Sequence, residues 1–229
     1  MSVLLRFGTL LLCVSLSATI CGAQDLASYR SFRLGSSVET VTSNTGNTRS
    51  RVIVIHNQPA VIEDLEWYAN GTPAAAAIGA SLRAIRFSFY NHSLFRMLVT
   101  YDPNKTQGLT TQDVIDAIAD EYGKPSMSTE MVRVSPLGTT FPAYEPILAQ
   151  WENEQYSYRL FRGSFGSTFG LVIVSKELEA LAVAASEKSL AQDQLDAPRK
   201  ELERRKQQDT ERLEADTKAR LTNKPQFRP

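Results

Sequence analysis

The sequence predicts an α+β protein in which two helix-then-strands units pack on one face of an antiparallel sheet, followed by a long charged C-terminal helix. Two segments carry apolar residues at helical spacing, and each precedes segments with the alternation of strands. The last part of the chain is mostly charged. Hydrophobic residues make up 42% of the chain, and its net charge is zero. This composition fits a globular protein and gives no overall attraction to nucleic acid, so no nucleic-acid partner is expected.

The first 23 residues are typical of a cleaved secretory signal. They contain one charge, Arg6, then an apolar run, and they end on the small residues Cys21, Gly22 and Ala23. The run is shorter than the roughly 20 residues that span a bilayer. A lipid anchor on Cys21 is the alternative, but Ile20 stands where a small residue is required. We therefore expect a periplasmic or secreted protein with no transmembrane segment after cleavage.

Cysteine chemistry is not expected in the mature chain. Both cysteines, Cys13 and Cys21, lie within residues 1–23. Disulfides, a thiolate nucleophile and a cysteine metal site are therefore ruled out after cleavage. We expect the mature chain to consist of an α+β domain over residues 24–175 and a helical extension with a flexible end over residues 176–229.

The first unit begins with a helix over residues 37–45. Ser36 and Glu39 form a capping-box pattern, and Gly46 follows as a stop signal. An unbroken β-branched run at 52–55 predicts a strand buried on both faces. A second short strand or a turn is expected at 65–68 and a loop at 70–81. A hairpin with strands at 85–90 and 94–101 turns at Asn91-His92.

The second unit repeats this order. A helix begins at Thr110 or Thr111 and ends at Gly123, with apolar residues at helical spacing along it. A loop at 126–146, a hairpin with strands at 147–152 and 156–161, and a strand at 168–174 follow. Residues 37–41 and 110–114 can be aligned so that a hydroxyl residue precedes a valine by four positions. An internal duplication is one interpretation of this match, and chance is the other.

The tail after residue 176 divides at Pro198. Before it, apolar residues such as Leu178 and Ala182 share a helical face that we expect to pack on the sheet. Proline is tolerated at a first helical position, so a second helix is expected to restart there. Residues 199–220 are too polar for a core and would form a rod of about 35 Å. Its leucines are too few for a regular heptad pattern, so a coiled coil is left open.

Charge is distributed unevenly along the chain, with basic residues in excess from Arg199 onward and acidic residues in excess between the signal and Pro198. A basic arm can fold back on its acidic body, bind an anionic surface, or remain solvated without a partner. The candidate partner-binding residues are those in the basic part of the arm: Arg199, Lys200, Arg204, Arg205 and Lys206.

No catalytic, cofactor or metal site is predicted. His56 and His92 lie in different units and have no apparent nucleophile or further ligands beside them. We expect the acidic cluster Glu63, Asp64 and Glu66 to lie exposed beside a turn, and a carboxylate-dependent hydrolase is the alternative. The aromatic residues of the strands leave open a small-ligand carrier that binds on an aromatic face of the sheet.

Two short motifs resemble a known group of proteins. Residues 32–41, FRLGSSVETV, are similar to the opening of many small secreted bacterial envelope proteins that are uncharacterised, and residues 118–125, IADEYGKP, resemble the segment that ends their helix. The pattern is more distantly similar to the SmpA/OmlA outer-membrane assembly lipoproteins and to β-lactamase-inhibitor-like folds. The resemblance implies helices on an antiparallel sheet and a non-enzymatic binding or assembly role, and it transfers no functional residue. The expected partner is an envelope protein or an anionic cell-surface component.

Overall fold

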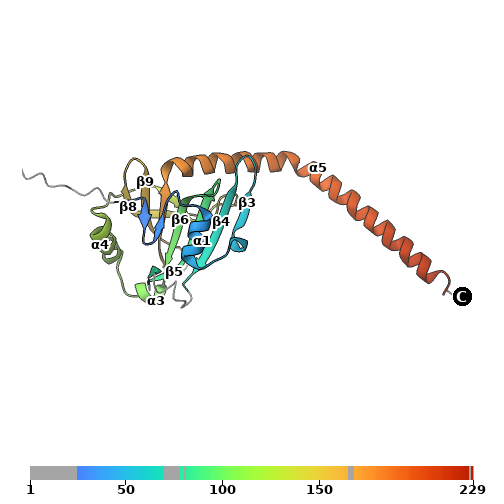
Figure 1. Ribbon diagram of the computed structural model, residues 1–229, viewed down its shortest axis with the longest axis horizontal. Helices are drawn as coiled ribbons and strands as arrows, with labels where there is room; N and C mark the ends of the chain where they lie inside the picture. The colour runs from blue at the N-terminus through green and yellow to red at the C-terminus, as the bar shows by residue number, and fades with distance from the viewer. Residues whose placement is uncertain (1–24, 70–77, 80, 165–167, 227, 229) are drawn as a thin grey trace, which may run out of the picture.

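The computed structural model describes residues 25–69, 78–79, 81–164, 168–226 and 228. Its centre is an antiparallel eight-stranded sheet in the order β3-β4-β5-β6-β10-β9-β8-β7, with a separate two-stranded hairpin of β1 and β2. Together with its helices and the long C-terminal helix, this makes the protein α+β, as predicted (Figure 1). The strands are β1 (Ser28–Tyr29), β2 (Phe32–Arg33), β3 (Ile53–His56), β4 (Ile62–Tyr68), β5 (Leu82–Tyr90), β6 (Ser93–Tyr101), β7 (Met131–Arg133), β8 (Tyr144–Glu152), β9 (Tyr156–Arg162) and β10 (Phe169–Ser175). The helices are α1 (Val38–Thr45), the 3-10 turn η1 (Arg49–Arg51), α3 (Pro103–Thr106), α4 (Thr111–Tyr122) and α5 (Lys176–Asn223).

The sheet consists of two units with the same order of elements. Helix α1 precedes the meander β3-β4-β5-β6, and helix α4 precedes the meander β7-β8-β9-β10. The last strands of the two meanders, β6 and β10, pair antiparallel at the centre of the sheet. Each unit is therefore a helix followed by four strands whose order runs from one edge of the sheet to its centre, and the internal duplication stays a prediction.

The two unit helices begin where local sequence favours it. The Ser37 hydroxyl accepts the Thr40 amide at the start of α1, and the left-handed Gly46 ends it. The expected capping box named Ser36, so the cap lies one residue later than predicted. Helix α4 begins with a complete capping box, in which Thr110 and Asp113 each bond to the other's backbone amide.

Both unit helices pack on the same face of the sheet. Val38 and Val41 of α1 and three apolar residues of α4 belong to the main core, together with Phe87, Leu171 and Ile173 from the strands. The β1-β2 hairpin covers part of this face, because Phe32 is buried against Phe87 with ring centroids 4.6 Å apart. Side chains alternate along a strand, so Val172 and Val174 lie on the other face.

Helix α5 covers the other face. Its buried residue Ala182 packs with Ile62, Phe95 and Leu137, and Figure 1 shows its first half lying across the sheet. The second half projects away from the body, and Figure 1 shows the helix changing direction along its length. α5 contains one proline, Pro198, and sharp bends in helices occur mostly at proline.

Three expectations about elements were wrong. The run at 52–55 is not a strand buried on both faces, because β3 is an edge strand whose Ile53 and Val54 are 63% and 55% exposed. Pro198 does not interrupt the tail, which is one helix from Lys176 to Asn223. The loop expected at 126–146 contains the short strand β7, which pairs with β8 at the other edge of the sheet. The signal and most of the loop expected at 70–81 lie outside the described residues.

Candidate partner-binding site

The first half of α5 is attached to the body by polar contacts at both ends of its docked surface. Near its start, Lys176 pairs with Glu152 at 2.6 Å, and Glu179 pairs with Arg159 at 3.4 Å. Farther along, the His56 ring at the end of β3 bonds to Ser189 through Nδ1 at 2.8 Å and to Ser186 through Nε2 at 3.2 Å. These contacts fix the direction in which the rest of α5 leaves the sheet.

His56 is itself held in place by a close approach of the backbone. Gly138 has a φ of +78°, and a Cβ there would lie 2.7 Å from the His56 Nε2 atom. A larger residue at this position would therefore displace the ring that joins β3 to α5.

A groove of about 880 Å³ lies beside this junction, between residues 54–59 and the part of α5 from Lys188 to Lys200. Its floor includes the edge strand β3, whose outer backbone edge has no neighbouring strand among the described residues. Exposed edge strands with apolar residues such as Ile53 and Val54 readily pair with another chain. The groove is thus bounded on one side by an exposed strand edge and on the other by the docked part of α5.

Beyond the groove, α5 is an exposed arm, defined here as residues 199–223. Every residue from Leu202 to Gln226 is exposed. The four exposed leucines from Leu195 onward, three of them in the arm, form a leucine stripe, because at about 100° per residue they fall within an arc of about 100°. The leucine stripe consists of Leu195, Leu202, Leu213 and Leu221.

The C-terminal part of the stripe borders a shallow hollow on the arm. Thr210, Leu213, Thr217 and Leu221 line a shallow, largely apolar hollow along the helix. Leu202 and Leu213 remain 54% and 67% exposed. An exposed apolar stripe on an otherwise charged helix is the pattern of a surface that packs on another helix or on a groove.

The five predicted basic residues do not form one surface. Successive residues on a helix point about 100° apart, so Arg199 and Lys206 lie on one side of the arm, Lys200 and Arg204 on a second side, and Arg205 on a third. Four of the five are also paired within α5, in the contacts Arg199–Asp196, Lys200–Asp193, Arg204–Glu201 and Arg205–Glu201.

These intrahelical pairs change the charge that the arm offers to a partner. The hydrogen bond from Lys200 holds the pKa of the Asp193 carboxyl below its usual value, and bonds from Arg205 and Arg204 do the same for Glu201. Lys206 has no ion-pair partner within the described part of the chain. Four of the arm's eight basic side chains are therefore paired within α5, and the leucine stripe is its more distinctive feature.

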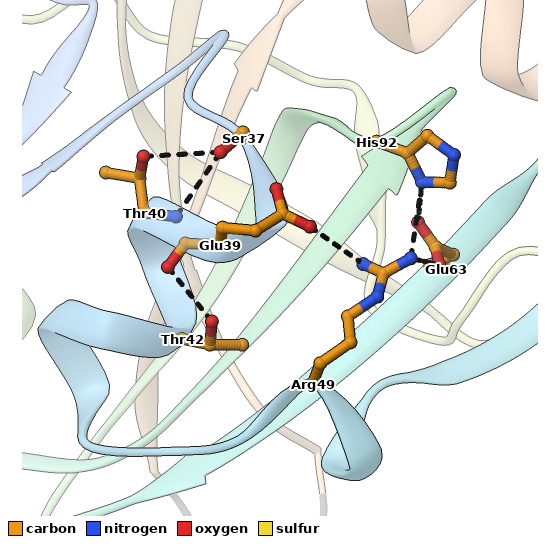
Figure 2. A network of polar contacts seen from close by, with 7 residues as sticks. All are labelled: Ser37, Glu39, Thr40, Thr42, Arg49, Glu63 and His92. Atoms are coloured by element: carbon orange, nitrogen blue, oxygen red, sulfur yellow. Dashed lines mark hydrogen bonds and ion pairs between the residues drawn. The ribbon is translucent and has the colours of Figure 1, made fainter.

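A second polar site lies on the opposite face of the sheet, at α1 (Figure 2). Glu63 of β4 is buried, and its carboxylate accepts hydrogen bonds from Arg49 and from His92 Nδ1, both at 2.7 Å. Arg49 also reaches Glu39 in the first turn of α1 at 4.0 Å. The network joins α1, η1, β4 and the β5-β6 turn, in which His92 has a left-handed φ of 68°.

The network has one feature in common with catalytic sites, a carboxylate that orients an imidazole ring. Among the residues that the structure describes, no group of three or more His, Cys, Asp or Glu side chains could hold a metal ion. The contacts of Glu63 instead satisfy a buried charge and connect elements that are distant in sequence. The acidic cluster was expected to lie exposed beside a turn, and the burial of Glu63 contradicts that interpretation.

The other two acids of the cluster point away from Glu63. Asp64 and Glu66 alternate with it along β4 and lie on the face that α5 covers. Burial raises the pKa of Asp64, although a hydrogen bond from Ser88 opposes the shift. Hydrogen bonds from Tyr68 and Arg86 lower the pKa of Glu66. Glu63 and Asp64 therefore lie on opposite faces of the sheet and cannot act together on one substrate. A hydrolase that uses these two carboxylates as its catalytic pair is excluded.

Sequence reasoning missed the leucine stripe and the groove. The stripe was recoverable from the sequence, since its four leucines can be placed on a helical wheel once the helix is known to continue through Pro198. The groove was not recoverable, because it depends on where β3 lies relative to α5. No helix among the described residues is long and apolar enough to cross a membrane. Comparison of the chain with family models, curated proteins and solved structures gives no match.

Proposed function

We propose that this protein is an exported, non-enzymatic binding or assembly protein of the cell envelope that contacts a partner protein through the arm of α5. The observation that carries the proposal is the leucine stripe, which lies on a helix with no protein surface over it from Leu202 onward. The secretory signal pattern of residues 1–23 and the resemblance to envelope proteins support export.

The energetics of an isolated helix support a partner for the arm. Most helical stability in proteins comes from packing an apolar face, and short isolated helices are marginal in water. Exposed ion pairs at i,i+4, such as Glu201–Arg205, contribute little to helix stability because solvent screens them. A partner that covers the leucines would add the burial that the arm lacks, at about 25 cal/mol per Å² of apolar surface.

A protein partner fits the arm better than an anionic surface does. Binding to an anionic surface relies on basic side chains that can face it together. Arg199, Lys200, Arg204 and Arg205 are instead paired within the helix and point around it. The leucine stripe lies on one side only, which suits the groove or helix of another protein.

The test is affinity capture from an envelope fraction with four versions of the mature chain. These are the intact chain, a chain truncated after Ala197, the stripe variant Leu202→Glu with Leu213→Glu, and a control variant. The control, Ala215→Glu with Ala219→Glu, adds the same charge on the opposite side of the helix.

We expect one identified protein to bind to the intact chain and to the control, and to be lost from the truncated chain and the stripe variant. Retention of the same protein by the truncated chain would refute the role of the arm. Equal loss in both double variants would show that charge, not the stripe, decides binding. Binding of the intact chain to anionic vesicles, with no protein captured, would favour the cell-surface alternative.

A further inference from the structure

The face of the sheet opposite α5 contains a cavity of about 230 Å³ that the proposed function does not use. It lies between α4, the strands β6 and β10, and the turn that follows β1. A cavity of about 150 Å³ in a protein core can hold benzene. The space beside α4 is therefore large enough for one small aromatic molecule with a polar substituent.

The walls of this cavity are divided between apolar and polar groups. Ile118 of α4 and Leu171 of β10 form an apolar side, and Leu109 lies at its exposed edge. Tyr29, Tyr101 and Tyr122 contribute phenol groups to the other side. A site with apolar walls and a few convergent polar groups is the usual form of a small-molecule site.

The phenol groups are hydrogen-bond donors. Burial raises the pKa of Tyr101 and of Tyr122, so both hydroxyls keep their protons at physiological pH. The hydroxyls of Tyr29 and Tyr101 lie 3.4 Å apart, longer than the 2.5–3.0 Å of an ordinary O–H···O hydrogen bond. A ligand oxygen placed between them would make better hydrogen bonds than they make with each other.

Two basic side chains lie at the rim of the cavity. Lys105 of α3 lines the cavity, and Arg30 lies in the tight turn between β1 and β2 with a left-handed φ of 54°. The Arg30 guanidinium donates to the Ile78 carbonyl and to the Ser81 hydroxyl. It also passes over Gly79, where any Cβ would overlap it. The guanidinium is therefore held in a fixed position at the cavity.

We propose that this cavity binds a small carboxylate with an aromatic or similarly apolar body. The apolar part of the ligand would lie against Ile118 and Leu171. Its carboxylate would face the tyrosine hydroxyls, Arg30 and Lys105. Glu121 also lines the cavity and forms a hydrogen bond with Tyr122, so the carboxylate must face Tyr29, Tyr101 and the basic side chains and lie away from Glu121. The donors of the site match an anionic acceptor, and its volume limits the ligand to about one ring.

This site is independent of the arm. It lies on the face covered by α1 and α4, whereas α5 covers the other face. A chain truncated after Ala197 keeps every residue of the cavity. The failure of either proposal therefore leaves the other untouched.

The experiment is a titration of the full mature chain with benzoate, phenylacetate and the neutral analogue benzamide, followed by amide NMR and calorimetry. We expect saturable binding of benzoate or phenylacetate with a Kd of about 1 mM or tighter. Amide shifts should be confined to α4, β6 and the β1-β2 turn. Benzamide should bind at least tenfold more weakly than benzoate.

Three variants locate the site. Ala117 is exposed on α4 and lines the cavity, so Ala117→Phe blocks it without disturbing the core. Gln112→Phe places the same bulk elsewhere on the exposed surface of α4. Tyr101→Phe removes one hydroxyl and keeps the ring. Ala117→Phe should reduce affinity at least tenfold, Tyr101→Phe severalfold, and Gln112→Phe not at all.

The outcomes are decisive. If neither carboxylate binds saturably, the site does not take this class of ligand. If Ala117→Phe leaves the affinity unchanged, the carboxylate binds elsewhere and the proposal is wrong. If benzamide binds as well as benzoate, Arg30 and Lys105 do not recognise the negative charge of the ligand, and the proposal of a carboxylate site is wrong.

Discussion

Replacing Pro198 with alanine should strengthen the helix at the point where the arm leaves the body. Proline lacks the amide hydrogen that would bond to the Gln194 carbonyl, and its ring crowds that carbonyl. Proline in a helix interior is less favourable than alanine by about 3 kcal/mol. Because a difference of about 1.4 kcal/mol changes an equilibrium constant tenfold, helix opening around residue 198 should become about 100-fold rarer.

Hydrogen–deuterium exchange measured by mass spectrometry tests this prediction. Peptides that span residues 190–205 should exchange up to about 100-fold more slowly in Pro198→Ala than in the unmodified chain. The last turns before Asn223 should change little, since helix ends fray independently of residue 198. The free energy of unfolding of the body should not change, because the arm is exposed and packs on nothing in the described structure.

The neighbouring exposed residue Ala197 provides the control. Ala197→Gly should weaken the helix by about 1 kcal/mol and speed exchange about fivefold in the same peptides. If exchange is the same in the unmodified chain and in Pro198→Ala, the proline does not weaken the helix around residue 198, and the prediction is wrong. If Pro198→Ala also stabilises the body, the arm and body are coupled and the description of an independent arm is wrong.

Three further predictions concern the body. Phe87→Ala empties a fully buried site beneath Phe32 and should lower the free energy of unfolding by about 3–5 kcal/mol in urea titrations, whereas a loss below 1 kcal/mol would contradict its place in the core. Thr110→Ala removes the hydroxyl that begins α4 and should cost about 1 kcal/mol, with Thr110→Ser retaining most of the stability. Asp64 has a raised pKa in the folded protein, so its contribution to stability is present below its ordinary pKa near 3.8 and is lost as pH rises through the folded value. The stability of the unmodified chain relative to Asp64→Asn should therefore fall as pH rises from about 3.5 to 6, and a relative stability that grows over this range would refute the assignment.

The elements that could be predicted are those whose signals are local. Helix α4 begins at Thr110 and ends before Gly123, as its capping residues and apolar spacing indicate. The β5-β6 hairpin turns at Asn91-His92, as its alternation and turn residues predict. In both cases the information lies within a dozen residues, and tertiary structure does not override it.

The predictions that were wrong concern properties that depend on how the strands are ordered and packed in the sheet. Residues 52–55 have the composition of a central strand, but β3 lies at the edge, and no property of Ile53 or Val54 indicates which position a strand occupies. Glu63 was expected to be exposed because acids usually are. Its burial depends on Arg49 and His92, which lie 14 and 29 residues away in sequence.

The arrangement of the five basic residues in space differs from their grouping in the sequence. Arg199, Lys200, Arg204, Arg205 and Lys206 are close in sequence, but a helix distributes them around its axis and supplies acidic neighbours for four of them. Their grouping in sequence therefore does not make a patch. The leucines behave in the opposite way, since widely spaced residues fall on one side of a continuous helix.

Site-specific photo-crosslinking in the envelope of the native host tests the central claim, that the leucine stripe contacts a partner protein. A photoreactive residue is placed at Leu213 on the stripe in one chain, and at Ala215 on the opposite side of the arm in another. The account predicts one discrete adduct with an identified envelope protein from position 213 and none from position 215. Adducts with the same protein from both positions, or from neither, would contradict it.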